Sequence, residues 1–148
     1  MIFVSVGTDT HDFSRLLRRM DEVARTKEVV MQIGHSHYRP RHARWFAFET
    51  NAAIDRLYSR ADVIVTHAGA GSIISALVYG KVPLVVPRLQ RFGEHVNDHQ
   101  LDVARFLDRK GMVKLVADLD RLPTMTARKY RPDRRLARRL DAYLEGRT

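Results

Sequence analysis

The stretch DVIVTHAGAGS, residues 62–72, decides the fold. Residues 62–66 form a β-branched, apolar run that is typical of a buried strand. HAGAGS follows at once and leads into IISALVYG, residues 73–80, whose apolar residues are typical of a helix. A joint made of Gly, Ala and Ser presents backbone N–H groups at the start of that helix, which is where proteins commonly bind phosphate.

The same order of strand and helix recurs along the chain. We expect strands at 1–6, 29–33, 45–48, 62–66, 84–86 and 112–116, and helices at 13–24, 51–61, 72–79, 98–110 and 133–145. Val-rich and Ile-rich strands that alternate with helices predict an α/β, Rossmann-like parallel sheet with helices on both faces. Ligands of such folds bind at the carboxyl ends of the strands, so the candidate loops are 6–12, 33–40, 67–72 and 87–100.

Length and composition limit the class of protein. The chain has 148 residues, of which 45% are hydrophobic and 29% charged, and this fits one compact domain. It has no apolar run of the roughly 18 to 20 residues that a membrane-spanning helix needs, and MIFVSV is too short for a signal peptide, so we expect a cytoplasmic protein. It also has no cysteine, which excludes disulfides, thiolate metal sites and thiol nucleophiles.

The net charge of +9 is concentrated at the C-terminal end. Residues 121–148 contain nine Lys or Arg and three Asp or Glu, so they carry +6 of it. We therefore separate a domain over residues 1–120 from a basic helical tail over residues 121–148. The tail is either a solvated helix face or a surface for anionic lipid head groups or an acidic partner. Nucleic acid is not the expected partner, because the tail lacks the interleaved aromatic residues of a single-strand binder.

HAGAGS matches neither the GxGxxG fingerprint of dinucleotide sites nor the GK[ST] ending of a P-loop. Gly69 and Gly71 still allow a phosphate to approach the backbone closely, and Ser72 can cap the helix whose positive end faces it. A purely structural tight turn explains the two glycines as well. His67 beside them makes either a structural hydrogen bond or a ligand contact.

The loop 87–100 holds a high density of polar side chains, which are Arg88, Arg91, Glu94, His95, Asn97, Asp98, His99 and Gln100. Its two arginines can pair with phosphate. Its carboxylates can accept bonds from sugar hydroxyls, and Gln100 offers both a donor and an acceptor. The alternative is a solvated loop in which Asn97 or Asp98 caps the next helix. No metal is expected, because the His95 and His99 pair and the His35 and His37 pair lack the HExxH order and a third ligand.

Five segments together resemble the glycosyltransferase family 28 C-terminal domain, over about residues 2–116: FVSVGTDTHDFSRL, MQIGHSHYRP, ADVIVTHAGAGSI, GKVPLVVPR and GEHVNDHQ. Within that family the chain is similar to two kinds of single-domain subunit. One is the PssE type of bacterial exopolysaccharide synthesis, and the other is the catalytic subunit of the two-subunit dolichol-linked N-acetylglucosamine transferase. The resemblance implies the donor-binding half of a GT-B fold, and an inverting UDP-sugar-dependent hexosyltransferase that needs no cofactor or metal.

The resemblance also implies roles for particular residues. Those on the diphosphate would be Gly7, Thr8, His67, Ala68, Gly69, Ala70, Gly71 and Ser72. Those facing the sugar and ribose would be Glu94, His95, Asp98, His99 and Gln100. Relatives usually carry an acidic residue on the ribose where this chain has Ser75, so Glu94 or another carboxylate would replace it. The general base would be His11, His67 or His95, or a group of the partner.

A GT-B enzyme closes two Rossmann-like domains over its substrates, and this chain can form only one. The resemblance therefore implies a membrane-anchored, PssD-like subunit that holds a lipid-linked acceptor at the cytoplasmic face of the membrane. The basic tail would contact lipid head groups or that partner. Two other functions stay open: a noncatalytic nucleotide-sugar-binding module that regulates or scaffolds polysaccharide assembly, and a protein that binds RNA or membrane through its tail.

Overall fold

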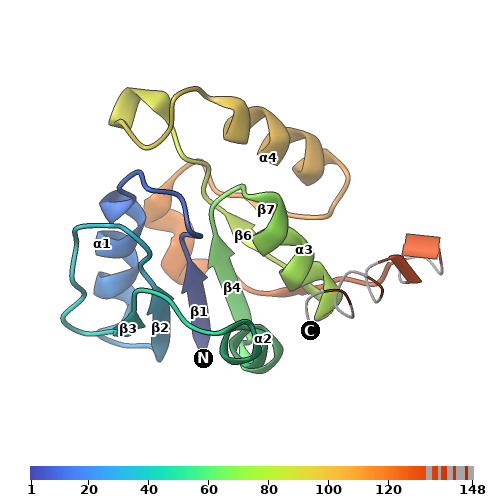
Figure 1. Cartoon of the computed structure of the whole chain (residues 1–148), viewed down its shortest axis with the longest axis horizontal. Coiled ribbons are helices and arrows are strands. Elements are labelled where there is room, and N and C mark those ends of the chain that lie inside the picture. The colour runs from blue at the N-terminus through green and yellow to red at the C-terminus, as the bar shows by residue number, and fades with distance from the viewer. Residues whose placement is uncertain (133–134, 137, 140–141, 143–145, 147–148) are drawn as a thin grey trace.

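The computed structural model describes residues 1–132, 135–136, 138–139, 142 and 146. In this part of the chain a six-stranded parallel sheet has the order β3-β2-β1-β4-β6-β7 (Figure 1). The strands are β1 (Ile2–Ser5), β2 (Val29–Gln32), β3 (Arg44–Phe46), β4 (Val63–Thr66), β6 (Leu84–Val85) and β7 (Lys114–Leu115). From β1 the chain adds β2 and β3 toward one edge of the sheet, and from β4 it adds β6 and β7 toward the other edge. The order of strands therefore reverses between β1 and β4, although all six strands are parallel.

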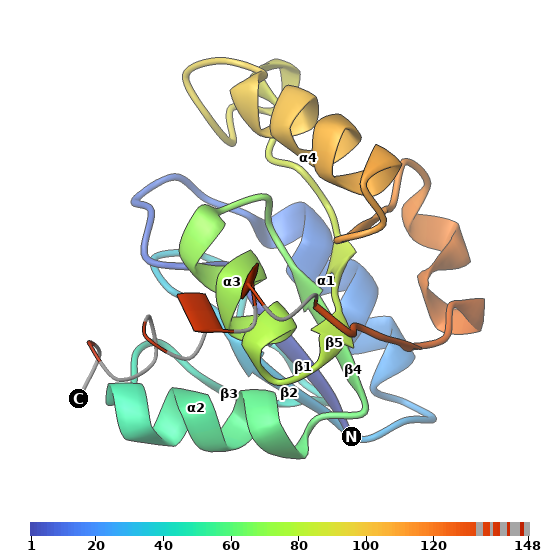
Figure 2. The ribbon, with the colours of Figure 1, turned by 90° about the vertical axis from the view of Figure 1, so that its right-hand side faces the viewer.

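Helices cover both faces of this sheet, which confirms the expected Rossmann-like fold. They are α1 (Ser14–Val23), α2 (Asn51–Arg60), α3 (Ala70–Val78) and α4 (His99–Arg109). Figure 2 shows α2 and α3 in front of the strands and α1 behind them. Successive strand residues alternate between the faces, so Phe3 packs with Tyr58 of α2 whereas Val4 packs with Leu17 of α1.

Local sequence explains where the helices begin. The apolar spacing in α1 buries Leu16, Leu17, Met20 and Val23 on one side. Thr50 caps α2, because its side chain accepts a hydrogen bond from the Ala53 N–H at 3.2 Å. Helix α3 begins at Ala70 with Gly69 as its N-cap residue, two positions earlier than expected. Ser72 therefore lies within the first turn and is not the cap.

The C-terminal part differs most from the expected elements. The strand expected at 112–116 is two residues long, and the short helices η1 (Gln90–Phe92) and η2 (Leu119–Thr124) were not expected. Strands β5 (Lys81–Val82) and β8 (Arg128–Lys129) form a small antiparallel sheet, so the start of the basic segment packs against the domain. The helix expected at 133–145 falls largely outside the described residues. Within the described ranges, none of the helices is long and apolar enough to cross a membrane.

Candidate functional site

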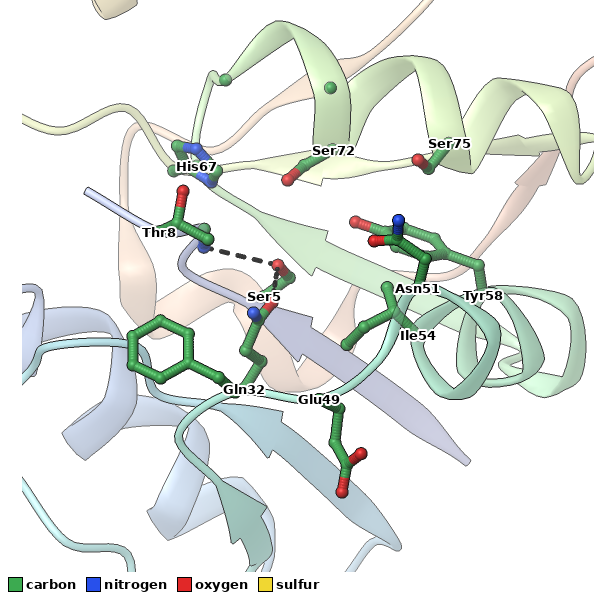
Figure 3. Close-up of a pocket in the computed structure, with 14 residues that line it drawn as sticks. Ser5, Thr8, Gln32, Glu49, Asn51, Ile54, Tyr58, His67, Ser72 and Ser75 are labelled. Carbon is green, nitrogen blue, oxygen red and sulfur yellow. Dashed lines mark hydrogen bonds between the residues drawn. The ribbon is translucent and has the colours of Figure 1, made fainter. Parts of the chain in front are cut away.

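An open cavity of about 380 Å³ lies beside the carboxyl ends of β1 and β4, where the strand order reverses (Figure 3). Open α/β sheets bind their ligands at this position. The residues that line it come from four strand ends and from α2 and α3: Ser5, Gly7, Thr8, Gln32, Phe48, Glu49, Asn51, Ile54, Tyr58, His67, Gly69, Gly71, Ser72 and Ser75. The cavity thus brings together Gly7, Thr8, His67, Gly69, Gly71 and Ser72 of the expected donor site.

The start of α3 forms one wall of the cavity. Gly69, Gly71 and Ser72 line it, and the first N–H groups of a helix have no partner inside that helix. The helix dipole adds partial positive charge at the same place. Among the described residues that line the cavity there is no Lys or Arg. Backbone groups are therefore what this wall offers to an anion.

His67 separates the first loop from the glycine loop. Its side chain is only 8% exposed and lies between Gly7 and Gly69. A Cβ on Gly7 would lie 2.5 Å from Cε1 of the ring, and one on Gly69 would lie 2.1 Å from Nε2. Gly7 also has a φ of 74°, which other residues rarely adopt. Both glycines are needed to accommodate the imidazole, so Gly69 has a structural reason of its own, and phosphate binding by the loop stays a prediction.

Hydrogen bonding defines the tautomer of His67. The Thr66 hydroxyl donates its proton to the Ser5 carbonyl at 2.8 Å and lies 3.2 Å from His67 Nδ1. With its proton committed, that hydroxyl can only accept from Nδ1, which leaves Nε2 as an acceptor. Burial and the nearby charge of Arg88 lower the pKa of His67 to about 4. The ring is therefore neutral at physiological pH and offers no charge to a phosphate.

The opposite end of the cavity lies between α2 and α3. Figure 3 shows Asn51 and Tyr58 of α2 across from Ser75 of α3. Beneath them, the Ser5 hydroxyl donates to Gln32 Oε1 at 2.8 Å and so forms a polar floor. Glu49 is the carboxylate among the described residues of the lining. This end offers amide and hydroxyl groups of the kind that bind a sugar or a base edge, whereas the Glu49 side chain points away from α3 (Figure 3).

Arg88 does not line the cavity, although the sequence made it a candidate for phosphate. Its side chain is 0% exposed and its guanidinium donates to backbone carbonyls. The bonds run to Val6 at 2.9 Å, to His11 at 2.9 Å and to Glu94 at 3.3 Å. Desolvation lowers the pKa of Arg88, opposed by nearby carboxylates. Arg88 therefore ties the first loop to the loop 87–100 in this structure.

The other polar residues of the loop 87–100 also lie outside the cavity lining, and several hold the loop itself. Glu94 is buried and accepts from Arg15 Nε at 2.7 Å and Nη2 at 2.9 Å. Asp98 Oδ1 accepts from the Gln90 N–H at 2.8 Å, and Gln100 Oε1 accepts from the Arg88 N–H at 3.1 Å. The N-cap residue of α4 is Asp98, but its side chain makes no capping hydrogen bond; Asn97 Oδ1 instead accepts from the His99 N–H at 2.9 Å in the turn that leads into the helix. The loop 33–40 likewise stays outside the lining.

His11 and Asp9 form a pair on the first loop. His11 Nδ1 lies 2.6 Å from Asp9 Oδ1, which also accepts the His11 backbone N–H at 2.7 Å. Partial burial alone would raise the pKa of Asp9, but these hydrogen bonds lower it below its usual value. The ring of His95 lies 6.0 Å from that of His11. Such a pair holds Nδ1 as the proton-bearing nitrogen and leaves Nε2 to accept a proton.

Sequence reasoning missed eight of the fourteen lining residues, which are Ser5, Gln32, Phe48, Glu49, Asn51, Ile54, Tyr58 and Ser75. Three of them stand in the run FETN, residues 48–51, between an expected strand and an expected helix. The rule that ligands bind at strand ends would have found this run. In the described part of the chain, no group of three or more His, Cys, Asp or Glu is placed to hold a metal ion.

Comparison with known proteins gives one family. The chain matches the model of the glycosyltransferase family 28 C-terminal domain over residues 1–143. It is similar to the UDP-N-acetylglucosamine transferase subunit ALG13 of Yarrowia lipolytica, with 37% identity over 62 residues that are 42% of this chain and 30% of that protein. The Mus musculus ALG13 is 30% identical over 122 residues, which are 74% of this chain and 10% of that protein. The chain thus spans under a third of these relatives.

Solved glycosyltransferases share the fold. The glycotransferase of kitacinnamycin is 21% identical with a TM-score of 0.59, covering 99% of this chain and 38% of that enzyme. Acinetobacter baumannii MurG is 22% identical with a TM-score of 0.53, covering 99% of this chain and 41% of MurG. These structures confirm the expected Rossmann-like half of a GT-B fold.

Proposed function

The chain belongs to the glycosyltransferase family 28 C-terminal domain family, and on that premise we propose that it is the donor-binding subunit of an inverting, UDP-sugar-dependent hexosyltransferase. The observation that carries this proposal is the cavity at the reversal of the sheet, with the start of α3 as one wall. A site of this kind fits a nucleoside diphosphate sugar.

The diphosphate is assigned to the start of α3. As the glycosidic bond breaks, negative charge grows on the leaving diphosphate, and N–H groups at a helix start stabilise it without a metal. Gly69, Gly71 and Ser72 supply this wall, and Thr8 faces it from the first loop. Ala68 and Ala70 complete the backbone run and do not line the cavity. His67, neutral and fixed, acts as the spacer that keeps the two loops apart.

The nucleoside is assigned to the end of the cavity between α2 and α3. Ser75 stands there in place of the acidic residue that the resemblance leads one to expect, and Glu94 is committed to Arg15. We assign the ribose hydroxyls to Asn51 and to Glu49, the carboxylate of the described lining, whose side chain has to turn toward α3 to reach them (Figure 3). Ser5 and Gln32 form the floor beneath.

His11 is assigned as the general base that takes the proton of the acceptor hydroxyl. A base must come within hydrogen-bond reach of that hydroxyl, and Asp9 holds the His11 ring in one tautomer. His67 is buried against the glycines and is a poorer candidate. His95 lies beside His11, and we assign both to the side of the site where the sugar and the acceptor meet. Asp98 and Gln100 accept backbone N–H groups of their own loop, so with His99 they are poorer candidates for the sugar.

A second subunit is part of the proposal. The chain covers 38% and 41% of two GT-B glycosyltransferases, so the acceptor half has to come from another polypeptide segment. We assign that half to a membrane-anchored, PssD-like subunit that holds a lipid-linked acceptor at the cytoplasmic face. The basic segment 121–148 contacts that subunit or the lipid head groups.

Calorimetric titration of the chain with UDP and a panel of UDP-sugars, with and without magnesium, tests the donor site. Saturable binding that is independent of magnesium supports it. The alternative is a noncatalytic nucleotide-sugar-binding scaffold subunit, which predicts the same binding but no turnover beside the acceptor subunit. Absence of binding, both for the chain alone and with its co-expressed partner, would overturn both readings.

A further inference from the structure

Exposed arginines surround the open edge of the sheet at β3. A cavity of about 330 Å³ on one side of this edge is lined by Arg18, Arg25 and Arg41. A second cavity of about 380 Å³ on the other side is lined by Arg44, Arg56 and Arg60. All six side chains are exposed, and residues 41–44 run directly from one cavity to the other. The two cavities therefore belong to one continuous basic surface, which we call the β3 edge.

Acidic groups neutralise little of the β3 edge. The described residues that line the two cavities include three carboxylates, Asp21, Glu22 and Glu49. Asp21 is buried and accepts the backbone N–H groups of Arg41, His42 and Ala43, so its role is to shape the loop. Glu22 pairs with Arg19 on α1 at 2.6 Å. Arg44 forms an exposed ion pair with Glu28 at 2.8 Å, so the other five arginines carry most of the positive charge that this surface offers to an anionic partner.

Aromatic side chains accompany these arginines. Trp45, on β3 itself, is 41% exposed, and Arg39 lies over its ring at 5.4 Å from the centroid. Phe48, three residues further on, is 47% exposed. Indole rings favour the interface between head groups and acyl chains, and Arg binds phosphate there while its aliphatic part covers apolar surface. A basic surface with an exposed Trp at its centre therefore suits both the anionic head groups and the adjoining ends of the acyl chains.

We propose that the β3 edge binds the anionic phosphate head groups of a membrane surface, with Trp45 inserted at the interface. Charge complementarity selects this occupant, because an anionic lipid surface attracts exposed basic residues, and five arginines stand here besides the Arg44 that pairs with Glu28. Glu49 lines both the basic cavity and the candidate donor cavity, so a membrane held here lies next to the donor site. The proposal rests on the surface alone and does not depend on UDP binding.

The sequence contains one Trp, so the fluorescence of Trp45 reports directly on this surface. The full chain is titrated with phosphatidylcholine vesicles with and without phosphatidylglycerol. We expect a blue shift and salt-sensitive partitioning with the anionic vesicles only, and quenching of Trp45 by brominated lipid. Since each basic residue near an anionic surface contributes about fivefold to partitioning, Arg56→Glu with Arg60→Glu should weaken it by at least about twentyfold.

Two control pairs locate the effect. Arg105 and Arg109 are also four apart and exposed on α4, and their replacement by Glu should leave most of the partitioning intact. Arg138 and Arg139 test the basic segment in the same way. The proposal is overturned if the tail pair abolishes partitioning while the β3 pair does not, or if brominated lipid leaves Trp45 unquenched in the unmodified chain. It is also overturned if RNA binds the β3 edge more tightly than anionic vesicles, or if inorganic phosphate alone gives the blue shift.

Discussion

The His67 imidazole occupies the space that a side chain on Gly69 would need, since a Cβ there would lie 2.1 Å from Nε2. Gly69 has φ of −78° and ψ of 133°, a conformation open to any residue. The glycine is therefore required by the neighbouring ring and not by its own backbone. In this loop the requirement for glycine at residue 69 arises from packing inside the protein.

Replacing Gly69 by Ala should destabilise the protein by about 1 to 3 kcal/mol, because the added methyl group forces the imidazole out of its place. The double variant Gly69→Ala with His67→Ala should be less destabilised than the sum of the two single variants, by about 1 kcal/mol or more. Urea unfolding of the four proteins measures this. Gly93→Ala is the control, since no atom lies within 4 Å of the added Cβ and only the φ of 67° disfavours alanine there. Additive single effects would show that the ring and the glycine are independent.

The low pKa of His67 makes stability depend on pH. Burial lowers the pKa to about 4 from 6.5, so between these values the unfolded chain binds more protons than the folded one. The contribution of His67 is thus fully present above pH 6.5 and is lost as the pH falls toward 4. We expect a loss of about 2 kcal/mol between pH 7 and pH 5.

The matched control for this pH effect is His67→Gln, which removes the titrating group but keeps a polar side chain. Urea unfolding at pH 7 and pH 5 should show a smaller fall in stability for this variant than for the parent chain. The carboxylates Asp9, Asp12 and Asp21 have pKa values below 3.8, so they titrate beneath this window. Parallel pH dependence in the two proteins would mean that His67 is not held neutral.

Much of the fold could be predicted because its pattern is local. Runs such as VIVT at β4 are β-branched and mostly apolar, which is typical of strands covered on both faces, and α1 shows regular apolar spacing. The short elements could not be predicted, because two-residue strands such as β7 depend on pairing with distant residues. Val85 forms that pair with Leu115, thirty residues away in the chain, and no local signal marks it.

The site was predictable only in part for a related reason. HAGAGS carries its own signal, since two glycines before an apolar helix are visible in the sequence. The roles of the loop 87–100 were not visible, because Arg88 and Glu94 are polar residues with partners in distant segments, such as Val6 and Arg15. Sequence alone cannot tell a buried structural guanidinium from one that faces a ligand.

Gly71→Asp should weaken UDP binding without unfolding the chain. A carboxylate in the first turn of α3 favours the helix dipole, so stability should hold or rise slightly. The same carboxylate repels a diphosphate at the helix start, and we expect UDP affinity to fall by tenfold or more. Calorimetry measures the affinity, and Gly71→Asn, of similar size but uncharged, should fall much less. If the Asp variant and the parent bind UDP with equal affinity, the diphosphate does not bind at the start of α3.

Arg88→Met should destabilise the protein by about 3 kcal/mol or more. The change leaves the carbonyls of Val6, His11 and Glu94 buried without their donor, and each such group costs about 1 to 3 kcal/mol. Arg91→Met, at an exposed position of the same loop, should change stability by less than about 0.5 kcal/mol. A stable Arg88→Met chain that loses UDP binding would instead support the phosphate contact first expected from the sequence.

His11→Gln should lower the rate of sugar transfer by about 10² to 10⁴-fold while UDP affinity stays unchanged, because a general base acts on the acceptor and not on the nucleotide. Asp9→Asn should lower the rate by a smaller factor, since His11 keeps its imidazole but loses the carboxylate 2.6 Å from Nδ1. The measurement needs the chain with its acceptor subunit and a lipid-linked acceptor. His37→Gln is the matched control, since this side chain is 90% exposed and does not line the donor cavity. If His11→Gln transfers sugar at the parent rate, the base belongs to the partner, and the Asp9 and His11 pair only shapes the first loop.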